Sequence, residues 1–356
     1  MHVGILTGGG DCPGLNAVIR AVVRKIHNVG GRCTGFLEGW RGLVEDLNEP
    51  LDIAETDGII DKGGTILGSS RTNPYRNPAS VSKLLHNFRL HNLTALVAIG
   101  GEDTLGVAHK LFVQEKLPVV GVPKTIDNDL SATDYTFGFD TSINIVTEAV
   151  DRIRTTTESH RRVMVIETMG RHAGWIACLS GIAVAADYIL VPEIPINIDH
   201  LCEALRQSRE RGKKYNIVVA SEGAQFPEGG AVTSDAEVDE FGHVRLGGIA
   251  EVISHMVERR LNLETRHVVL GHLQRGGAPS AADRVLATRF GLRAADLVLH
   301  GQFGQMAALK GQEIIPVPLA EAVTATKRLS MQYYLEAQEW FSGAMPADRE
   351  VTPAAW

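Results

Sequence analysis

Short apolar runs recur along the chain, and each one ends in a glycine-rich or polar segment. Runs of this length, separated by stretches with helical periodicity, are typical of parallel strands that helices cover on both faces. We therefore predict strands at Val3–Leu6, Ala95–Ile99, Val119–Val122, Val163–Ile166, Ile217–Ala220 and Val268–Leu270.

Two of the intervening stretches carry apolar residues at the spacing of a helix, one from residue 17 to 22 and the other from residue 143 to 153. The chain thus alternates strand and helix, which predicts an α/β fold with parallel sheets. In open parallel sheets, ligands bind beyond the carboxyl ends of the strands. We therefore expect the polar segments that follow the runs to converge on one face.

The length of 356 residues is that of about two domains. Hydrophobic residues make up 44% and charged residues 22%, as in ordinary folded proteins. The net charge of -7 argues against a nucleic-acid-binding surface, which needs clustered Lys and Arg. No apolar run approaches the ~20 residues that cross a bilayer, and the first residues do not have the order of a signal peptide. We expect a cytoplasmic protein that binds neither nucleic acid nor membranes.

The four cysteines are far apart in the sequence, and none belongs to a C-x-x-C pair. This spacing suggests neither a disulfide framework nor a zinc site, so we expect reduced, mostly buried thiols. The residues are Cys12, Cys33, Cys178 and Cys202.

Two segments have the composition of peripheral structure. Residues 226–248 are rich in Gly, Asp and Glu, and we expect an exposed hairpin or loop there. Residues 345–356 contain two prolines, and we expect them to form a C-terminal tail.

A glycine-rich turn, T-G-G-G-D, follows the first predicted strand and leads into a helix. Gly8, Gly9 and Gly10 would let a phosphate approach backbone N–H groups at the helix N-terminus, where the helix dipole favours negative charge. The turn matches neither G-x-G-x-x-G nor G-x-x-x-x-G-K-[ST]. By itself it fits a phosphate site and a simple tight turn equally well.

An acidic pair, Glu102 and Asp103, follows two glycines after the second predicted strand, in A-I-G-G-E-D-T. Two carboxylates should repel the phosphate that a glycine-rich loop usually binds. The pair therefore raises the question of which phosphate compound such a loop would accept.

The segment P-K-T-I-D-N-D follows the third predicted strand. Of its two carboxylates, Asp127 and Asp129, one could accept the proton of an attacking hydroxyl, and the other could bind magnesium directly or through water. The neighbouring Lys124 suits phosphoryl charge. An Asp-rich turn that caps the next helix is the structural alternative for this segment.

Three later strand ends add cationic and hydrogen-bonding groups. Arg and His suit a phosphate, and a carboxylate suits sugar hydroxyls. A single Arg is most often a solvated surface charge, but five strand ends with such groups favour a sugar-phosphate site. The residues are Met169, Gly170, Arg171, His172, Glu222, Arg266, His272, Gln274 and Arg275.

In chain order, six motifs resemble those of the 6-phosphofructokinase family, and their spacing matches from about residue 3 to residue 290. They read G-G-G-D-x-P-G-x-N, G-G-E-D-T, P-K-T-I-D-N-D, M-G-R-x-A-G, S-E-G and G-H-x-Q-R-G-G. The resemblance implies an α/β fold of two similar Rossmann-like three-layer lobes with mostly parallel sheets, and an active site in the cleft between them.

The same resemblance implies how the chain divides. The phosphoryl-donor-binding lobe would comprise residues 1–138 plus about 274–322. The sugar-phosphate-binding lobe would comprise residues 139–273 plus about 323–344, followed by the tail at 345–356.

Roles for individual residues also follow from the resemblance. Asp127 is implied as the base that deprotonates the 1-hydroxyl of fructose 6-phosphate, with Arg171, Lys124 and Asp103 as further catalytic residues. Donor contacts are implied for Gly10, Arg71, Asp103, Thr104 and Lys124. Sugar-phosphate contacts are implied for Thr125, Asp127, Arg162, Met169, Gly170, Arg171, Glu222, Arg266, His272 and Arg275.

The resemblance further implies a metal and a partner. Glu102 would hold Mg²⁺, with Asp129 as a second carboxylate acting through water. The assembly would be a homodimer or homotetramer in which Arg162 and Arg266 reach the sugar phosphate of a neighbouring subunit.

The family divides by phosphoryl donor at the positions of Asp103 and Lys124. ATP-using members usually have Gly at both, reading G-G-D-G and P-G-T-I-D. The chain therefore resembles the diphosphate-dependent branch, in which the aspartate takes the space and the charge of the nucleotide α-phosphate.

Electrostatics favour the same donor. Two unit charges about 4 Å apart repel by roughly 4 kcal/mol at an effective dielectric near 20. The charge of Asp103 would therefore weaken the binding of a nucleotide α-phosphate close to a thousandfold. Diphosphate has no phosphate at the α position, and Lys124 could neutralise the phosphate that leaves. The sequence thus favours a reversible diphosphate-dependent 6-phosphofructokinase. An ATP-dependent enzyme and a non-catalytic sugar-phosphate-binding subunit are the alternatives.

Overall fold

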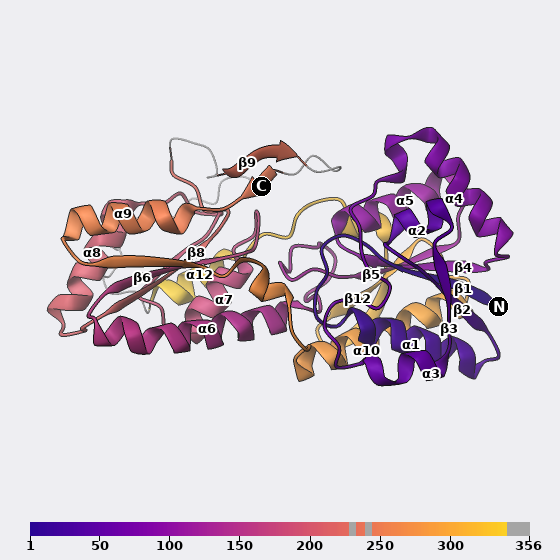
Figure 1. Cartoon of the computed structure of the whole chain (residues 1–356), viewed down its shortest axis with the longest axis horizontal. Helices are drawn as coiled ribbons and strands as arrows, with labels where there is room; N and C mark the ends of the chain where they lie inside the picture. Colours follow the sequence, from indigo (N-terminus) through magenta and orange to yellow (C-terminus); the bar gives the residue numbers. More distant parts are fainter. Residues whose placement is uncertain (228–232, 239–243, 340–356) are drawn as a thin grey trace. The chain divides into compact units, whose positions relative to one another are not determined.

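The chain divides into two compact units, each built around its own β-sheet. The computed structural model describes residues 1–227, 233–238 and 244–339 (Figure 1). Unit 1 comprises Met1–Ile145, Asp235–Arg245 and His272–Lys327. Unit 2 comprises Val146–Ser234, Leu246–Gly271 and the chain from Arg328 onward.

Unit 1 contains a seven-stranded sheet in which the five central strands are parallel. The two outer strands, β3 and β13, are antiparallel to their neighbours. In spatial order the strands are β13 (Glu313–Pro318), β12 (Gln305–Lys310), β5 (Val119–Pro123), β4 (Ala95–Gly100), β1 (His2–Thr7), β2 (Arg32–Phe36) and β3 (Asn48–Leu51).

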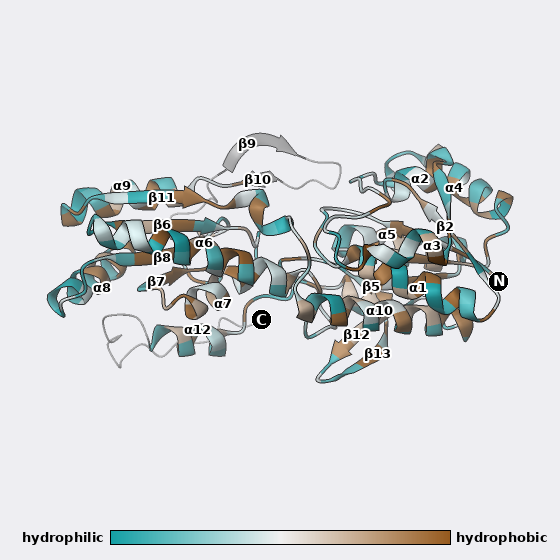
Figure 2. Ribbon diagram, turned by 60° about the horizontal axis from the view of Figure 1, so that its bottom comes forward, coloured by the Kyte–Doolittle hydropathy of each residue, from teal (hydrophilic) through white to brown (hydrophobic). Residues whose placement is uncertain are grey.

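Helices cover both faces of this sheet, so unit 1 has three layers (Figure 1). Every residue of β1, β4 and β5 is buried as a result. Figure 2 shows the hydropathy of each described residue. One face carries α2 (Trp40–Glu45), α4 (Pro78–Leu90) and α5 (Glu102–Glu115), and the other α1 (Leu15–Asn28), α3 (Ile53–Thr56) and α10 (Ala281–Leu299). The short α11 (Leu319–Ala322) packs on α5.

Unit 2 contains a four-stranded, fully parallel sheet. Its strands in spatial order are β11 (Thr265–Val269), β6 (Val163–Thr168), β8 (Asn216–Ser221) and β7 (Tyr188–Leu190). The sheet lies between α9 and α6 (Figure 1), α8 packs on α9, and α12 packs on α7. The helices are α6 (Phe139–Ser159), α7 (Trp175–Ala183), α8 (Ile198–Glu210), α9 (Ile249–Leu261) and α12 (Met331–Gln338).

All six apolar runs form parallel strands, which confirms the predicted α/β class. The prediction that every strand is covered on both faces is wrong for β11. Arg266, His267 and Val269 are exposed there, because β11 is the edge of the unit 2 sheet. The runs also miss β2, β3, β7, β12 and β13. Of these, β3 and β13 are antiparallel edge strands, and Thr34 and Gly35 interrupt the apolar residues of β2. Strands β7 and β12 contain three and four consecutive apolar residues, which the prediction did not include.

The predicted hairpin within residues 226–248 is confirmed in outline. Strands β9 (Thr233–Val238) and β10 (Val244–Leu246) pair in a two-stranded sheet. The predicted tail at residues 345–356 lies outside the described residues.

All four cysteines are buried and free, as predicted. Burial raises the pKa of the Cys12, Cys33 and Cys178 thiols to about 12, so they stay protonated at neutral pH. Within the part of the chain that the structure describes, no helix combines the length and the apolar character needed to cross a membrane.

The first turns of α6 and α10 are joined by a buried carboxyl group, Asp283, which is 1% exposed. Its Oδ2 accepts hydrogen bonds from the Thr141 backbone N–H at 2.8 Å and from the Thr141 hydroxyl at 2.5 Å. Ser280 caps α10 by accepting the Asp283 N–H at 3.2 Å, and its hydroxyl donates to Asp140 at 2.6 Å. Burial raises the pKa of Asp283 to about 6, although the bonds from Thr141 oppose this.

This carboxyl group should make the stability of the fold depend on pH. Because its folded-state pKa is raised from 3.8 to about 6, it favours the folded state most below pH ~4 and loses that contribution as the pH rises through 6. Asp283→Asn should remove a fall of roughly 3 kcal/mol in the free energy of unfolding between about pH 4 and pH 7. Denaturant unfolding of both proteins across that range measures the difference.

The matched control is Asp296→Asn on the same helix, where the carboxylate is part-exposed and faces Lys25. This variant should keep the fall in stability. If Asp283→Asn and the unmodified chain have parallel stability curves, the buried carboxyl is not the source of the dependence.

Candidate functional site

Three of the predicted motifs meet at one edge of the unit 1 sheet. Strands β1, β4 and β5 are adjacent and parallel, so the segments that follow them leave from the same edge. The Gly8 N–H donates to Ile99 O at 2.9 Å, and the Lys124 N–H donates to Gly100 O at 3.0 Å. Strand pairing therefore continues into the loops and holds the three segments side by side.

Thr104 explains two of the glycines at this edge. Its side chain is 3% exposed and fills the space beside Gly8 and Gly100. A Cβ atom at Gly8 would lie 2.6 Å from Thr104 Oγ1, and one at Gly100 would lie 2.3 Å from Thr104 Cβ. Packing alone thus requires glycine at both positions.

Lys124 is buried beneath the glycine-rich turn, with 4% of its surface exposed. Its ammonium group donates a hydrogen bond to Gly10 O. Burial lowers its pKa, whereas the nearby Asp127 and Asp11 carboxylates act in the opposite direction. The Lys124 nitrogen is therefore held directly under the backbone of the turn.

Arg275 lies against the same turn. Its Nη1 is 3.3 Å from Asp11 O, and a Cβ atom at Gly10 would lie 2.9 Å from that nitrogen. The 3₁₀ segment Gly271–Arg275 that carries it also contains His272, which is exposed. Two of the residues expected at the sugar phosphate thus belong to unit 1, and Arg275 adds a second cation beside Gly10.

A buried asparagine anchors the loop that precedes Arg71. Asn16 is 1% exposed, donates to Lys62 O at 3.1 Å and accepts the Ile66 N–H at 2.8 Å. The Gly9 N–H donates to Ser70 O at 3.0 Å. The sequence offers no role for Asn16 beyond its place in the glycine-rich motif, because its partners are backbone groups of Lys62, Gly63 and Ile66, some 50 residues away.

The acidic pair occupies the first turn of α5. Gly101 is the N-cap, and Glu102 and Asp103 are the first two residues of the helix. Glu102 is exposed and Asp103 is half-buried. A helix N-terminus favours negative charge, so the helix stabilises both carboxylates at the sheet edge where the glycine-rich turn ends.

Asp127 is the most enclosed carboxylate at this edge, 4% exposed. Its backbone N–H is bonded to Thr125 Oγ1 at 3.0 Å. Its Oδ1 is buried and has no hydrogen-bond partner among the described residues. Buried polar atoms normally have a partner, so this oxygen is available to a bound group.

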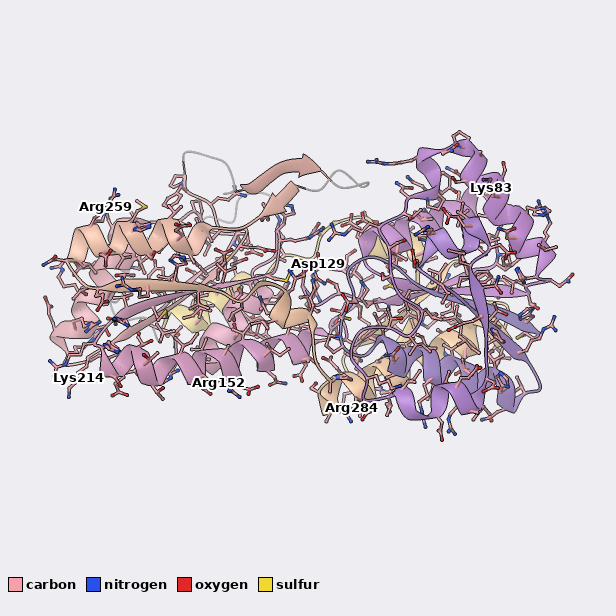
Figure 3. All side chains as sticks on the ribbon, viewed as in Figure 1. Lys83, Asp129, Arg152, Lys214, Arg259 and Arg284 are labelled. Carbon is pink, nitrogen blue, oxygen red and sulfur yellow. The ribbon has the colours of Figure 1, made fainter. Side chains whose placement is uncertain are left out.

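Carboxylate oxygens at this edge fit a magnesium ion. Among the described residues, no group of three or more His, Cys, Asp and Glu side chains could hold a metal ion alone. Magnesium, however, is often held by one or two carboxylates together with substrate phosphates and water. The exposed Glu102 and the half-buried Asp129, which Figure 3 labels, match that arrangement.

In unit 2, the segment after β6 is fixed by the segment after β8. The Arg171 N–H donates to Glu222 Oε1 at 3.2 Å, and the Glu222 N–H donates to Thr168 O at 2.8 Å. Arg171 has a φ of 49°, a left-handed conformation that is uncommon outside glycine. Gly223 packs so closely that a Cβ atom there would lie 1.7 Å from Arg171 O. The M-G-R-H-A-G and S-E-G motifs are therefore one structural element.

Arg162 and Arg266 lie at the opposite end of these strands. Both bind Glu264, at 2.8 Å and 2.7 Å, and the hydrogen bond from Arg162 is the main cause of the lowered pKa of Glu264. Arg162 precedes β6 and Arg171 follows it. Six residues at about 3.3 Å each separate the two strand ends by about 20 Å. One chain does not bring Arg162 and Arg171 together.

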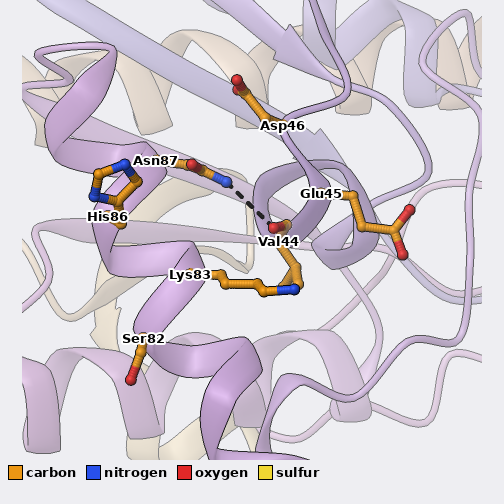
Figure 4. Close-up of a pocket in the computed structure, with 7 residues that line it drawn as sticks. All are labelled: Val44, Glu45, Asp46, Ser82, Lys83, His86 and Asn87. Carbon is orange, nitrogen blue, oxygen red and sulfur yellow. Dashed lines mark hydrogen bonds between the residues drawn. The ribbon is translucent and has the colours of Figure 1, made fainter.

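A separate surface pocket of about 590 Å³ lies between the end of α2 and α4 (Figure 4). Asn87 closes its base by donating to Leu43 O at 3.0 Å and Val44 O at 3.2 Å. None of the predicted site residues lines it. Its lining consists of Val44, Glu45, Asp46, Ser82, Lys83, His86 and Asn87.

The chain is similar to known proteins over nearly its whole length. The sequence model of a family described as phosphofructokinase matches residues 2–298. The chain is 54% identical over 342 residues to the pyrophosphate–fructose 6-phosphate 1-phosphotransferase of Streptomyces coelicolor, covering 96% of this chain and 100% of that protein. It is 47% identical over 343 residues to the ATP-dependent 6-phosphofructokinase of Mycobacterium tuberculosis, with the same coverage.

A similar fold has also been solved. The crystal structure of a pyrophosphate-dependent phosphofructokinase from Marinobacter aquaeolei superposes with a TM-score of 0.78 at 26% identity. The match covers 98% of this chain and 94% of that chain. The arrangement of strands and helices is therefore common to both.

The contact between Gly223 and Arg171 can be tested directly. Gly223→Ala would press a methyl group into the Arg171 carbonyl, so the backbone must move. We expect the free energy of unfolding to fall by roughly 1–3 kcal/mol or more, as in other overpacked sites. Gly58→Ala is the control, since a Cβ atom there meets nothing within 4 Å. Equal thermal stability of the two variants in calorimetry would contradict the tight contact.

Proposed function

The chain belongs to the phosphofructokinase family, and from this we propose that it transfers a phosphoryl group from diphosphate to the 1-hydroxyl of D-fructose 6-phosphate. The products are fructose 1,6-bisphosphate and phosphate, and the reaction is reversible. The observation that carries this proposal is the buried, unpartnered Oδ1 of Asp127, at the sheet edge where Lys124 underlies the glycine-rich turn.

In the proposed reaction, the oxygen of the sugar 1-hydroxyl attacks the terminal phosphorus of diphosphate, and Asp127 accepts the proton of that hydroxyl. The bond from that phosphorus to the bridging oxygen breaks, and phosphate leaves. Lys124 neutralises charge on the leaving phosphate, and Arg171 does so on the transferred group. Because little other covalent chemistry is needed, positioning and charge account for most of the catalysis.

Donor and sugar phosphate are assigned to different residues. We assign the donor to Gly10, Arg71, Asp103, Thr104 and Lys124, all in unit 1. We assign the sugar phosphate to Thr125, Asp127, Met169, Gly170, Arg171, Glu222, His272 and Arg275, with Arg162 and Arg266 of a second copy. The separation of about 20 Å between the two ends of β6 supports this last assignment, because Arg162 cannot join Arg171 within one chain.

We further propose that Glu102 holds Mg²⁺, with Asp129 contacting it through water. When bound, the ion would neutralise the phosphate charges of the donor. Glu102 would then attract the donor through the ion rather than repel it. We propose a cytoplasmic enzyme, since both substrates are charged metabolites of that compartment.

Asp103 and Lys124 support diphosphate over ATP as the donor. Asp103 is half-buried in the first turn of α5, and its charge would oppose an α-phosphate. Three relatives that are named for pyrophosphate are 53–55% identical to this chain and a fourth is 46% identical, whereas relatives that are named for ATP are 47–48% identical. An ATP-dependent enzyme remains the second candidate because of those relatives.

A donor comparison tests the first candidate. With magnesium and fructose 6-phosphate, we expect turnover with diphosphate and little with ATP. Asp103→Gly should reduce the preference for diphosphate over ATP by up to about a thousandfold, because a repulsion of roughly 4 kcal/mol between Asp103 and the α-phosphate is removed. Glu115→Gly, at the other end of α5, should leave the donor ratio unchanged.

Three results would contradict parts of this proposal. Turnover with ATP and none with diphosphate would identify ATP as the phosphoryl donor. An unchanged donor ratio in Asp103→Gly would remove the role of Asp103 in selection. Binding of fructose 6-phosphate without turnover from either donor would indicate a non-catalytic sugar-phosphate-binding subunit.

Mixed oligomers test whether a site uses residues of two chains. Asp127→Asn should lower kcat by about 100- to 10 000-fold, and Arg162→Ser should raise the KM for fructose 6-phosphate about 10- to 100-fold. Co-expressed as differently tagged chains, the two variants form hybrids in which one site has both intact residues. At fructose 6-phosphate concentrations well below the KM of the unmodified chain, we expect about a quarter of wild-type activity for random pairing of two chains. Activity no higher than in the separate variants would show that Arg162 serves its own chain.

A further inference from the structure

The end of unit 1 is bound to the loop that carries Asp127. Leu130 and Thr326 form an isolated antiparallel bridge, and the Lys327 N–H donates to Asp129 O at 2.7 Å. Lys327 is the last residue of unit 1, and Arg328 belongs to unit 2. The chain thus pairs with the Asp127 loop immediately before it leaves the unit.

The Lys327 side chain forms a second connection to the same loop. Its Nζ donates to Asn128 Oδ1 at 3.0 Å, Thr133 O at 2.9 Å and Asp134 O at 2.8 Å. An ammonium group has three N–H donors, and these three contacts can use all of them. The acceptors lie on both sides of the turn at residues 128–134, so one side chain closes that turn.

Asn128, the neighbour of Asp127, depends on this ammonium group for its orientation. It is 1% exposed and has a left-handed backbone, with a φ of 52°. Its Oδ1 accepts the Thr136 N–H at 3.2 Å in addition to Lys327. The Thr136 hydroxyl in turn donates to Thr125 O at 2.8 Å. Asn128 is thus held in an unusual conformation by donors from two segments, and the backbone on either side of Asp127 is held with it.

We propose that Lys327 is a positioning residue for phosphoryl transfer: through the Asn128 side chain it holds the loop that presents Asp127 to the substrate hydroxyl. The proposal rests on the function proposed above. Lys327 does not touch the reacting atoms in this role. It sets the direction of a carboxylate oxygen that has no hydrogen-bond partner of its own among the described residues.

The first test replaces the ammonium group with an apolar chain of similar length, Lys327→Met. Because misplacement of a reacting group by about 1 Å can cost about a hundredfold, we expect kcat to fall roughly 10- to 100-fold. The KM values for fructose 6-phosphate and diphosphate should change less than about threefold. Lys310→Met is the matched control, since Lys310 also contacts Asp134, at 3.2 Å, but from an exposed position at the end of strand β12.

A second variant, Asn128→Gly, removes the acceptor of the hydrogen bond from Lys327. Glycine adopts the left-handed backbone conformation of this position readily, and the variant should lower kcat to a similar extent. If Lys327 acts through Asn128, the double variant should be no worse than the poorer single variant within about threefold. Effects that multiply, or a loss confined to KM, would overturn the proposal.

Amide hydrogen exchange of the peptide containing residues 125–130 gives a readout that does not need activity. Exchange should be faster in Lys327→Met than in Lys310→Met if Lys327 orders the loop. Unchanged exchange together with unchanged kcat refutes the positioning role. Absence of turnover in the unmodified chain would refute the proposed function instead, and the exchange result would still decide whether Lys327 holds the loop.

Discussion

The parallel pairing of β1, β4 and β5 is the constraint on which the rest of unit 1 depends. Parallel neighbours end at the same edge of a sheet, so three segments that are distant in sequence leave from one place. The hydrogen bonds from Gly8 to Ile99 and from Lys124 to Gly100 extend that pairing past the strands. The glycine-rich turn, the acidic first turn of α5 and the Asp127 loop are neighbours for this reason.

The glycines in these motifs serve packing as much as ligand binding. Gly8 and Gly100 leave room for the buried Thr104, Gly10 leaves room for Arg275, and Gly223 leaves room for the Arg171 carbonyl. In each case a methyl group would meet an atom within 3 Å. At the glycine-rich turn the same residue type would also let a phosphate approach the backbone, so both requirements select glycine and the motif alone does not separate them.

Several charged groups that are buried in unit 1 have hydrogen-bond partners. Lys124 and Lys327 donate to backbone carbonyls, and Asp283 accepts from Thr141. Burial lowers the pKa of Lys124 and Lys327 and raises the pKa of Asp283, so in each case it favours the neutral form. The exception among the described carboxylates of this edge is Asp127, whose Oδ1 has no partner. An enclosed acceptor of this kind is costly to the fold, which is consistent with its use as a base toward substrate.

The sequence by itself determined the α/β class, the six parallel strands that carry apolar runs, and the chemistry that follows each strand, because strand burial and strand-end polarity are local patterns. It also determined the acidic pair and Lys124, and our proposal for the donor is based on Asp103 and Lys124. Tertiary structure alone decided which loops hold one another. Asn16 reaches backbone some 50 residues away, and Lys327 closes a turn almost 200 residues before it. Neither residue has a local pattern, since each acts through the position of backbone carbonyls that only the folded chain brings within hydrogen-bonding distance.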